Sequence, residues 1–339
     1  MDLTGKIKIS TKAIVMVVIL LSLFWFLVFN QNIYQKGQEK SKAEIGAWFF
    51  PGFCELEATI NKLPKIDVIK PQWAYLNEDG VLKFYNESEN CDGFSAKNVE
   101  LIKSRSNRQY LNVVNLKSVL PMRKLFESKN KKSLFVKQVA DFLIREDVDF
   151  DGVEIDFEGS LEWSVEDFEN YIEFLAELKG EFEKFDLEVI VDMPAIDNQM
   201  NLQVDHPYKY SRIAQLGLDG YVLMMYDYMY GKIDPVGISP EDWVERVVNF
   251  AMDEFGEEKT KLIGGIHSYA YRTEASKVVR DLEYLRFVDI QKNSKYLEAV
   301  RDSSGELSFV DQGKRYYFAD SIYLQKRKDF FGRVGITAG

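Results

Sequence analysis

Three acidic side chains, Glu154, Asp156 and Glu158, alternate with apolar residues along the segment 150–158, FDGVEIDFE. Successive side chains of a strand point to opposite faces, so the three carboxyl groups would share one face at spacings of about 6–7 Å. The apolar residues between them would pack on the other face. Burial and like charge both raise a carboxyl pKa, so such a row gives folding no benefit. The segment therefore predicts a functional site.

Two other interpretations of this acidic segment were weighed. A solvent-facing edge strand disagrees with the apolar character of the opposite face. A carboxylate cluster for Mg²⁺ or Ca²⁺ would usually draw carbonyl, Asn or water ligands from a flexible loop. Catalysis explains the pattern better, and we expect neither a metal ion nor an organic cofactor.

The rest of the composition narrows the chemistry. The only histidines are His206 and His267, and the two cysteines, Cys54 and Cys91, form no C-x-x-C pair, which argues against a zinc site of Cys and His ligands. No G-x-S-x-G segment supports a serine nucleophile, and we interpret both histidines as structural. The net charge of −11 would repel a phosphate backbone, so nucleic acid is not an expected partner.

The elements that position the acidic segment follow a regular alternation. From residue 45 on, short apolar stretches rich in β-branched and aromatic residues alternate with longer helical ones. Eight such units predict an α/β chain that closes into a (β/α)8 TIM barrel. An open doubly wound sheet would usually carry a Gly-rich turn after its first strand, and Pro51-Gly52-Phe53 is not that motif. The strand candidates are residues 45–50, 66–75, 110–115, 148–157, 187–193, 219–226, 261–267 and 333–337.

Additions to the barrel and helix starts are also visible. Asn77-Glu78-Asp79-Gly80 predicts a hairpin after the second strand. Turn-rich residues 270–318 predict a small insertion after strand seven that forms one wall of a cleft. Ser164 with Asp167 predicts a capping box, and Ser239 followed by Pro240 predicts a second helix start with Ser239 as its N-cap.

The amino-terminal segment predicts a membrane anchor. Residues 13–29 are an almost uninterrupted apolar run after the lysine-bearing residues 1–12. No small-x-small cleavage site follows, so we favour an uncleaved signal anchor over a cleaved signal peptide. Residues 30–44 would be a linker, and the barrel, residues 45–339, would lie on the extracytoplasmic side. Cleavage would instead make the protein secreted.

Two motifs carry a family resemblance. Residues 151–158 resemble the D-G-x-D-x-D-x-E signature of glycoside hydrolase family 18, the chitinase family. The match covers Asp151, Gly152, Asp156 and Glu158, with Glu154 where the family usually has Asp. Met224-Met225-Tyr226-Asp227 resembles the family's M-x-Y-D at the end of strand six. More loosely, PQWAY around Trp73 resembles its aromatic second strand, and residues 317–326 resemble the D-x-x-S-x-x-x-K approach to strand eight in bacterial members.

The resemblance implies a retaining, substrate-assisted hydrolysis next to an N-acetylated sugar. Glu158 would protonate the glycosidic oxygen while the sugar's own acetamide oxygen attacks the anomeric carbon. Asp156 would orient the acetamide N–H, Tyr226 would bind its oxygen, and Asp227 would contact the same sugar. The expected partner is a polysaccharide or oligosaccharide containing β-linked N-acetylglucosamine, either chitin-type or peptidoglycan. Further candidate contacts are Asp151, Glu154, Met224, Trp73, Asp192 and Met193.

For several of these residues a purely structural role is an open alternative. Tyr226, Met224, Met193 and Trp73 are also ordinary core residues of a barrel, and Asp227 suits a turn. Whether Cys54 and Cys91 pair is likewise undecided by two positions in a sequence.

Two departures from the family pattern qualify the resemblance. Glu154 is one methylene longer than the usual Asp and would crowd Asp156. No Trp follows Trp243, although family members usually place one at the end of strand eight as the floor of the cleavage subsite. A non-hydrolytic glycan-binding protein on the same barrel is therefore the alternative function.

Overall fold

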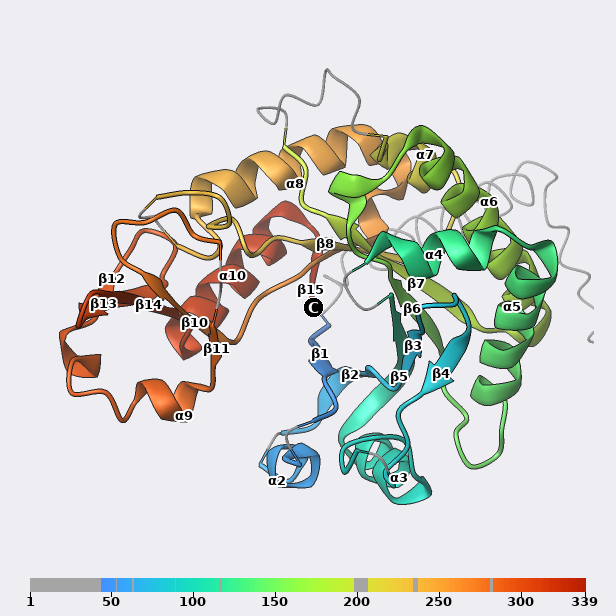
Figure 1. Cartoon of the computed structure of the whole chain (residues 1–339), viewed down its shortest axis with the longest axis horizontal. Helices are drawn as coiled ribbons and strands as arrows, with labels where there is room; N and C mark the ends of the chain where they lie inside the picture. The colour runs from blue at the N-terminus through green and yellow to red at the C-terminus, as the bar shows by residue number, and fades with distance from the viewer. Residues whose placement is uncertain are drawn as a thin grey trace, which may run out of the picture. The chain divides into compact units, whose positions relative to one another are not determined.

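The computed structural model describes residues 44–339, except 53, 63, 89, 116–117, 198–206, 234–236 and 281–282. Eight parallel strands form a barrel, as the sequence predicts (Figure 1). A parallel bridge between Ile45 and Ala338 joins the first strand to the last and closes the sheet. In sheet order the strands are β1 (Gly46–Phe49), β2 (Ile66–Pro71), β5 (Ser106–Val114), β6 (Gly152–Asp156), β7 (Glu188–Pro194), β8 (Gly220–Met224), β9 (Leu262–Gly264) and β15 (Thr337–Ala338).

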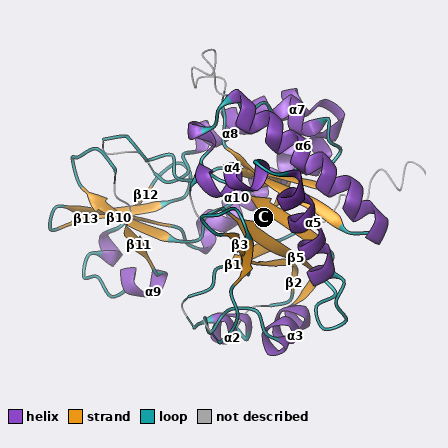
Figure 2. Cartoon of the chain, turned by 45° about the vertical axis from the view of Figure 1, so that its right-hand side comes forward, coloured by secondary structure: helices purple, strands orange, loops and turns teal. Residues whose placement is uncertain are grey.

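Helices cover the outer face of the barrel (Figure 2). The apolar side chains that alternate with the acids on β6, Val153 and Ile155, are fully buried in the core between strands and helices. The longer helices are α3 (Ala96–Arg105), α4 (Val119–Phe126), α5 (Lys129–Leu143), α6 (Val165–Phe182), α8 (Glu241–Phe255) and α10 (Ser321–Val334). Shorter ones are α2 (Leu56–Ile60), α7 (Tyr210–Ala214) and α9 (Phe287–Ile290), with 3-10 turns at Ser160–Glu162, Glu183–Phe185, Gly256–Lys261 and Tyr296–Glu298.

Both predicted additions to the barrel are present. The hairpin after the second strand pairs β3 (Ala74–Leu76) with β4 (Leu82–Phe84), and β3 also extends the barrel sheet along β5. Between β9 and α10 the chain forms a separate antiparallel sheet, seen at the left of Figure 1. Its order is β11 (Glu283–Leu285), β10 (Ala270–Glu274), β14 (Lys314–Phe318), β13 (Leu307–Asp311) and β12 (Val300–Arg301).

Of the predictions about the ends of single helices and strands, one is confirmed and two are wrong. The capping box of Ser164 and Asp167 is confirmed at the start of α6. Ser239 is not an N-cap: α8 begins at Glu241, and the Ser239 hydroxyl instead donates to the carbonyl of Met225 at 2.6 Å. The predicted eighth strand was wrong in its bounds. Residues 333–334 still belong to α10, because the sequence gives no helix stop before Gly335, which ends the helix with a left-handed φ of 83°.

Two further predictions concern the pairing of the cysteines and the amino-terminal segment. Cys54 and Cys91 form a disulfide between the segment before α2 and the segment before α3. The predicted anchor at 13–29 and linker at 30–44 lie outside the described residues, apart from Glu44. Among the residues that are described, no helix is long and apolar enough to cross a membrane.

Candidate active site

The acidic side chains of β6 point into the barrel, on the face opposite Val153 and Ile155. Glu154 is fully buried there and accepts a hydrogen bond from Asn112 Nδ2 on the neighbouring β5 at 3.1 Å. Glu158 follows the strand at its carboxyl end. Its backbone is held on both sides by Asn115, which donates to the Glu158 carbonyl at 2.9 Å and accepts from the Glu158 N–H at 3.0 Å.

Two further partners of Glu154 come from the first two strands. Trp48 Nε1 donates to one carboxylate oxygen, and Lys70 Nζ forms an ion pair with the other. Lys70 is buried with a relative exposure of 2%. The sequence analysis missed this lysine. The available signal was a charged residue at an inward position of the apolar strand IDVIKP.

Carboxyl groups accumulate around this pair. Exclusion of water raises the pKa of Asp156 well above its usual value, with the charges of Glu158 and Glu154 adding to the shift and Lys70 opposing it. Burial also raises the pKa of Asp192, helped by the charges of Glu154 and Asp156 and by a hydrogen bond between Asp192 and Glu154. A hydrogen bond between two carboxyl groups requires a proton on one of them, and the raised pKa of Asp192 agrees with that requirement.

Tyr226 and Asp227 extend the site from the end of β8. The pKa of Tyr226 is raised well above its usual value, first by burial and then by Asp192, Asp156 and Glu158, which places its phenol among those carboxyl groups. Asp227 adopts a left-handed φ of 62°. The structure thus brings Tyr226 to the acids of β6, as the motifs predict.

The insertion supplies tyrosines around Asp227. Tyr269 and Tyr271 each donate a phenolic hydrogen bond to Asp227 Oδ1 at 2.9 Å. Tyr284 packs edge-on against Tyr271, with ring centroids 4.4 Å apart, and is half exposed. Its pKa is raised by burial and by the charges of Asp227 and Glu158, so it lies on the same side of the site as the catalytic candidate. The insertion was expected to form a wall, but these tyrosines were not identified individually.

Met224 is partly exposed and follows Val222, which faces the barrel interior, by two residues, so both point inward. Three other predicted contacts are not brought to the site, and their placement there was wrong. Met193 is fully buried among the helix-facing core residues, since it follows the inward-facing Asp192 by one position. Trp73 is also core, and its Nε1 donates to the carbonyl of Asp92 at 2.8 Å.

Asp151 lies at the opposite, amino-terminal end of β6. Its carboxylate accepts the backbone N–H of Gln109 at 2.7 Å, where β5 begins to pair with β6. Two other aspartates, Asp67 and Asp219, do the same for neighbouring strands at this end. Asp151 therefore satisfies a backbone donor that strand pairing leaves open.

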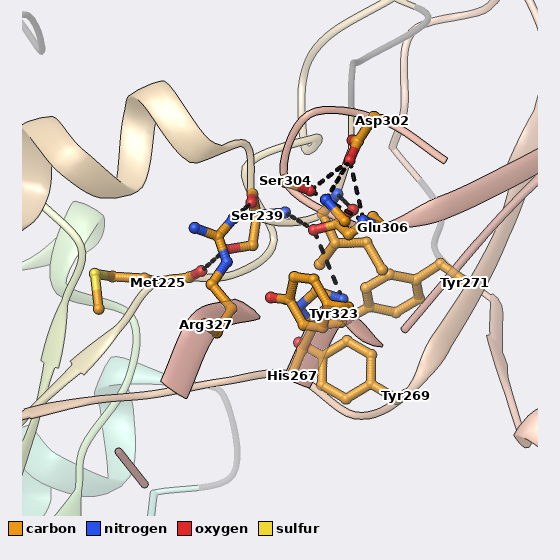
Figure 3. Close-up of polar contacts among 12 residues, drawn as sticks. Met225, Ser239, His267, Tyr269, Tyr271, Asp302, Ser304, Glu306, Tyr323 and Arg327 are labelled. Atoms are coloured by element: carbon orange, nitrogen blue, oxygen red, sulfur yellow. Dashed lines mark hydrogen bonds and ion pairs between the residues drawn. The ribbon is translucent and has the colours of Figure 1, made fainter. Parts of the chain in front are cut away.

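A buried polar network fixes the loop between β8 and α8 to the insertion (Figure 3). Glu306, in the turn before β13, accepts the backbone N–H groups of Ile238 and Ser239 at 2.6 Å each. Arg327 of α10 donates to the carbonyl of Ser239. These contacts hold the loop that begins with Tyr226 and Asp227.

His267 borders the same network and has a structural setting. Its Nδ1 lies 2.9 Å from the Tyr323 hydroxyl and its Nε2 lies 3.8 Å from Glu306. Burial, with a smaller contribution from Arg327, lowers its pKa to about 3, so the ring is neutral. His206 is outside the described residues. Within the described ranges no group of His, Cys, Asp or Glu is arranged to hold a metal ion.

The carboxyl groups of β6 and Tyr226, which follows β8, thus lie at the carboxyl ends of the strands of a parallel α/β barrel, where barrel enzymes carry their active sites. The sequence profile of the Glycosyl hydrolases family 18 matches residues 32–328. The chain belongs to that family.

Solved structures agree on the fold. A chitinase from Chromobacterium violaceum has a TM-score of 0.70 at 17% identity, covering 87% of this chain and 93% of that one. The spore cortex-lytic enzyme SleL of Bacillus cereus has a TM-score of 0.70 at 18% identity, covering 87% and 70%. A class V chitinase variant from Nicotiana tobaccum, in complex with NAG4, has a TM-score of 0.67 at 15% identity, covering 88% and 92%. No curated protein matches the sequence.

Proposed function

We propose that this family 18 glycosidase hydrolyses β-linked glycans containing N-acetylglucosamine, with retention of configuration and with the substrate's own acetamide as nucleophile. The observation that supports the proposal is that Tyr226 lies within electrostatic reach of Asp156 and Glu158: burial raises its pKa first, and the charges of Asp192, Asp156 and Glu158 raise it further. Within the described residues, Asp156 Oδ1 is buried without a hydrogen-bond partner. An unsatisfied buried oxygen is costly, and an acetamide N–H of a bound sugar would satisfy it.

Each residue then has one task. Glu158 donates its proton to the glycosidic oxygen as the bond to the anomeric carbon breaks and the acetamide oxygen attacks from the other side. Asp156 holds the acetamide N–H, and the Tyr226 hydroxyl donates to the acetamide oxygen, which keeps that oxygen in attack geometry. Glu158, now ionised, takes a proton from the water that opens the oxazolinium ring. Asp227, held by two tyrosine hydroxyls, binds the same sugar.

We propose a bacterial cell-wall glycan as the substrate on at least equal terms with chitin. The structural relatives include both chitinases and a spore cortex-lytic enzyme. For the floor of the cleavage subsite, Trp48 is the candidate aromatic. Its ring lies beside the end of β15, where a Cβ built on Gly339 would be 3.5 Å from Trp48 Cη2.

The test is Glu158→Gln in the full-length chain in detergent, assayed on N-acetylglucosamine oligomers and on peptidoglycan with products identified by mass and anomer. We expect turnover to fall by a factor of about 10²–10⁴ or more, because the general acid is lost, with Tm unchanged. Glu162→Gln, at an exposed position one turn further on, is the matched control and should retain full activity.

Equal sugar release by the wild type and Glu158→Gln would end the proposal. Saturable oligosaccharide binding with no product after long incubation would instead establish the alternative, a non-hydrolytic glycan-binding protein.

We propose further that the barrel is held at the extracytoplasmic side of a membrane by residues 13–29. The Cys54–Cys91 disulfide supports an oxidising compartment, since structural disulfides rarely persist in a reducing cytosol. In cell fractionation the full-length chain should stay with membranes through alkaline carbonate extraction, and its cysteines should react with maleimide only after reduction. Release of the chain by carbonate, or cysteines that react before reduction, would contradict this location.

A further inference from the structure

Lys70 occupies an unusual position for a lysine, at the centre of a barrel. Its side chain has a relative exposure of 3%, and that of its ion-pair partner Glu154 has 0%. The ammonium also lies 4.4 Å from the ring centroid of Trp48. Burying an ammonium ion is expensive unless a countercharge and polar partners surround it, so a lysine at this depth requires the carboxylate it meets.

Glu154 is held by donors from three different strands. Trp48 Nε1 of β1, Lys70 Nζ of β2 and Asn112 Nδ2 of β5 all reach its carboxyl oxygens. Trp48 and Asn112 donate hydrogen bonds, and Lys70 adds a positive charge, so the carboxyl group is fixed from three sides. The extra methylene of Glu154, relative to an aspartate, extends the carboxylate toward this set.

The neighbouring carboxyl groups, Asp192 and Asp156, have surroundings that differ from those of Glu154. Asp192 shares a hydrogen bond with Glu154, and its pKa is raised first by burial and then by the charges of Glu154 and Asp156. Asp156 has the Lys70 cation as an opposing influence but no direct contact with it among the described residues. The groups that face Glu154 and Asp156 are Trp48 and Lys70 from β1 and β2, Asn112 from β5, Glu158 after β6, Tyr171 from α6, Asp192 from β7 and Tyr226 after β8.

We propose that Lys70 and Glu154 act as a positioning pair: the buried ion pair fixes the Glu154 carboxyl group between β1, β2 and β5, and thereby sets the place and the electrostatic surroundings of Asp156 and Asp192. This inference rests on the proposed function. It makes Glu154 and Lys70 interdependent: each residue alone would be an uncompensated buried charge. Neither residue touches substrate in this role.

The experiment is a double-mutant cycle of Lys70→Met, Glu154→Gln and the pair together, in the full-length chain in detergent. Each single change should lower Tm, because it leaves one buried charge without its partner, and the double variant should regain most of that loss. The acid limb of the kcat/KM profile should move upward by about one pH unit in Lys70→Met, because the cation that lowers the pKa of Asp156 is gone. The double variant should return toward the wild-type profile, with KM little changed throughout.

Lys179→Met is the matched control, since Lys179 forms a partly buried ion pair with Asp219 at 3.0 Å, next to the start of β8. It should leave the pH profile where it is. Two results would overturn the proposal. One is a double variant whose Tm is no higher than that of the less stable single variant. The other is a pH profile of Lys70→Met that superimposes on the wild-type profile. If the wild type releases no sugar, the proposed function fails, while the Tm cycle still decides whether the pair is interdependent.

Discussion

Gly152 in the motif D-G-x-D is explained by close packing of the backbone and not by catalysis. A Cβ at this position would lie 2.1 Å from the carbonyl oxygen of Glu188, on the neighbouring β7. The two strands begin their pairing here, with Gly152 opposite Glu188. A side chain would force the two strands apart at the start of the strand that carries Glu154 and Asp156.

Gly152→Ala should therefore lower the free energy of unfolding by about 3 kcal/mol, because overpacking against a backbone carbonyl cannot be relieved by a rotamer change. Gly180→Ala is the control, since Gly180 lies in α6 with nothing within 4 Å of its built Cβ. It should be neutral or stabilising by about 0.5–1 kcal/mol. Denaturant unfolding measures both, and equal stability of the two variants would refute this explanation of the motif glycine.

At the scale of single residues, the sequence predicted which side chains of β6 share a face, but it did not predict which residues of other strands meet them. The alternation of Glu154, Asp156 and Glu158 with apolar residues is enough to separate the two faces of one strand. The same rule separates Asp192 from Met193, which cannot both face the cleft. Lys70 was overlooked because burial of a lysine depends on a partner from another strand, which no local pattern reveals.

The loop between β8 and α8 and the insertion are coupled through Glu306. Burial raises the pKa of Glu306 from 4.5 to about 7, although the N–H groups of Ile238 and Ser239 and the charge of Arg327 favour its ionised form. A carboxyl group whose pKa is higher in the folded state than in the unfolded state stabilises the fold only while it is protonated. Its contribution is complete below pH 4.5 and is lost as the pH rises to about 7.

Glu306→Gln should remove this dependence, because glutamine does not titrate. Between pH 4.5 and pH 7 the wild type should lose on the order of 3 kcal/mol more stability than the variant, from a shift of that size. Tm measured across this interval gives the comparison. Glu298→Gln in the same insertion, at an exposed ion pair with Lys295, should follow the wild-type curve. Parallel Tm curves for wild type and Glu306→Gln would contradict the assignment.

At the scale of elements, the strands were easier to predict than the helix ends. Each of the eight barrel strands overlaps one of the predicted stretches. The start of α8 differs from the prediction because the Ser239 hydroxyl bonds to the carbonyl of Met225 instead of capping the helix. Its partner, Met225, directly follows β8, and the residues next to Ser239 in the sequence do not reveal this contact.

For the molecule as a whole, the path of the chain brings distant segments together at one end of the barrel. The catalytic candidates of β6, the pair Tyr226 and Asp227 after β8, and Tyr284 of the insertion meet only because parallel strands deliver their carboxyl ends to the same side. The disulfide between Cys54 and Cys91 joins two further segments: Cys54 lies after β1, and Cys91 lies after β4 of the hairpin.

The sequence by itself determined the class of fold, the face of β6 that carries the acids and the family to which the motifs point, because these depend on local periodicity and on residue types at fixed spacing. Only the tertiary structure decided that Lys70 meets Glu154, that Trp73 and Met193 are core, and that Glu306 holds the loop after β8. These outcomes depend on which strands become neighbours and how deeply each side chain is enclosed. Neighbour and depth are properties of the closed barrel, so no single stretch of chain contains them.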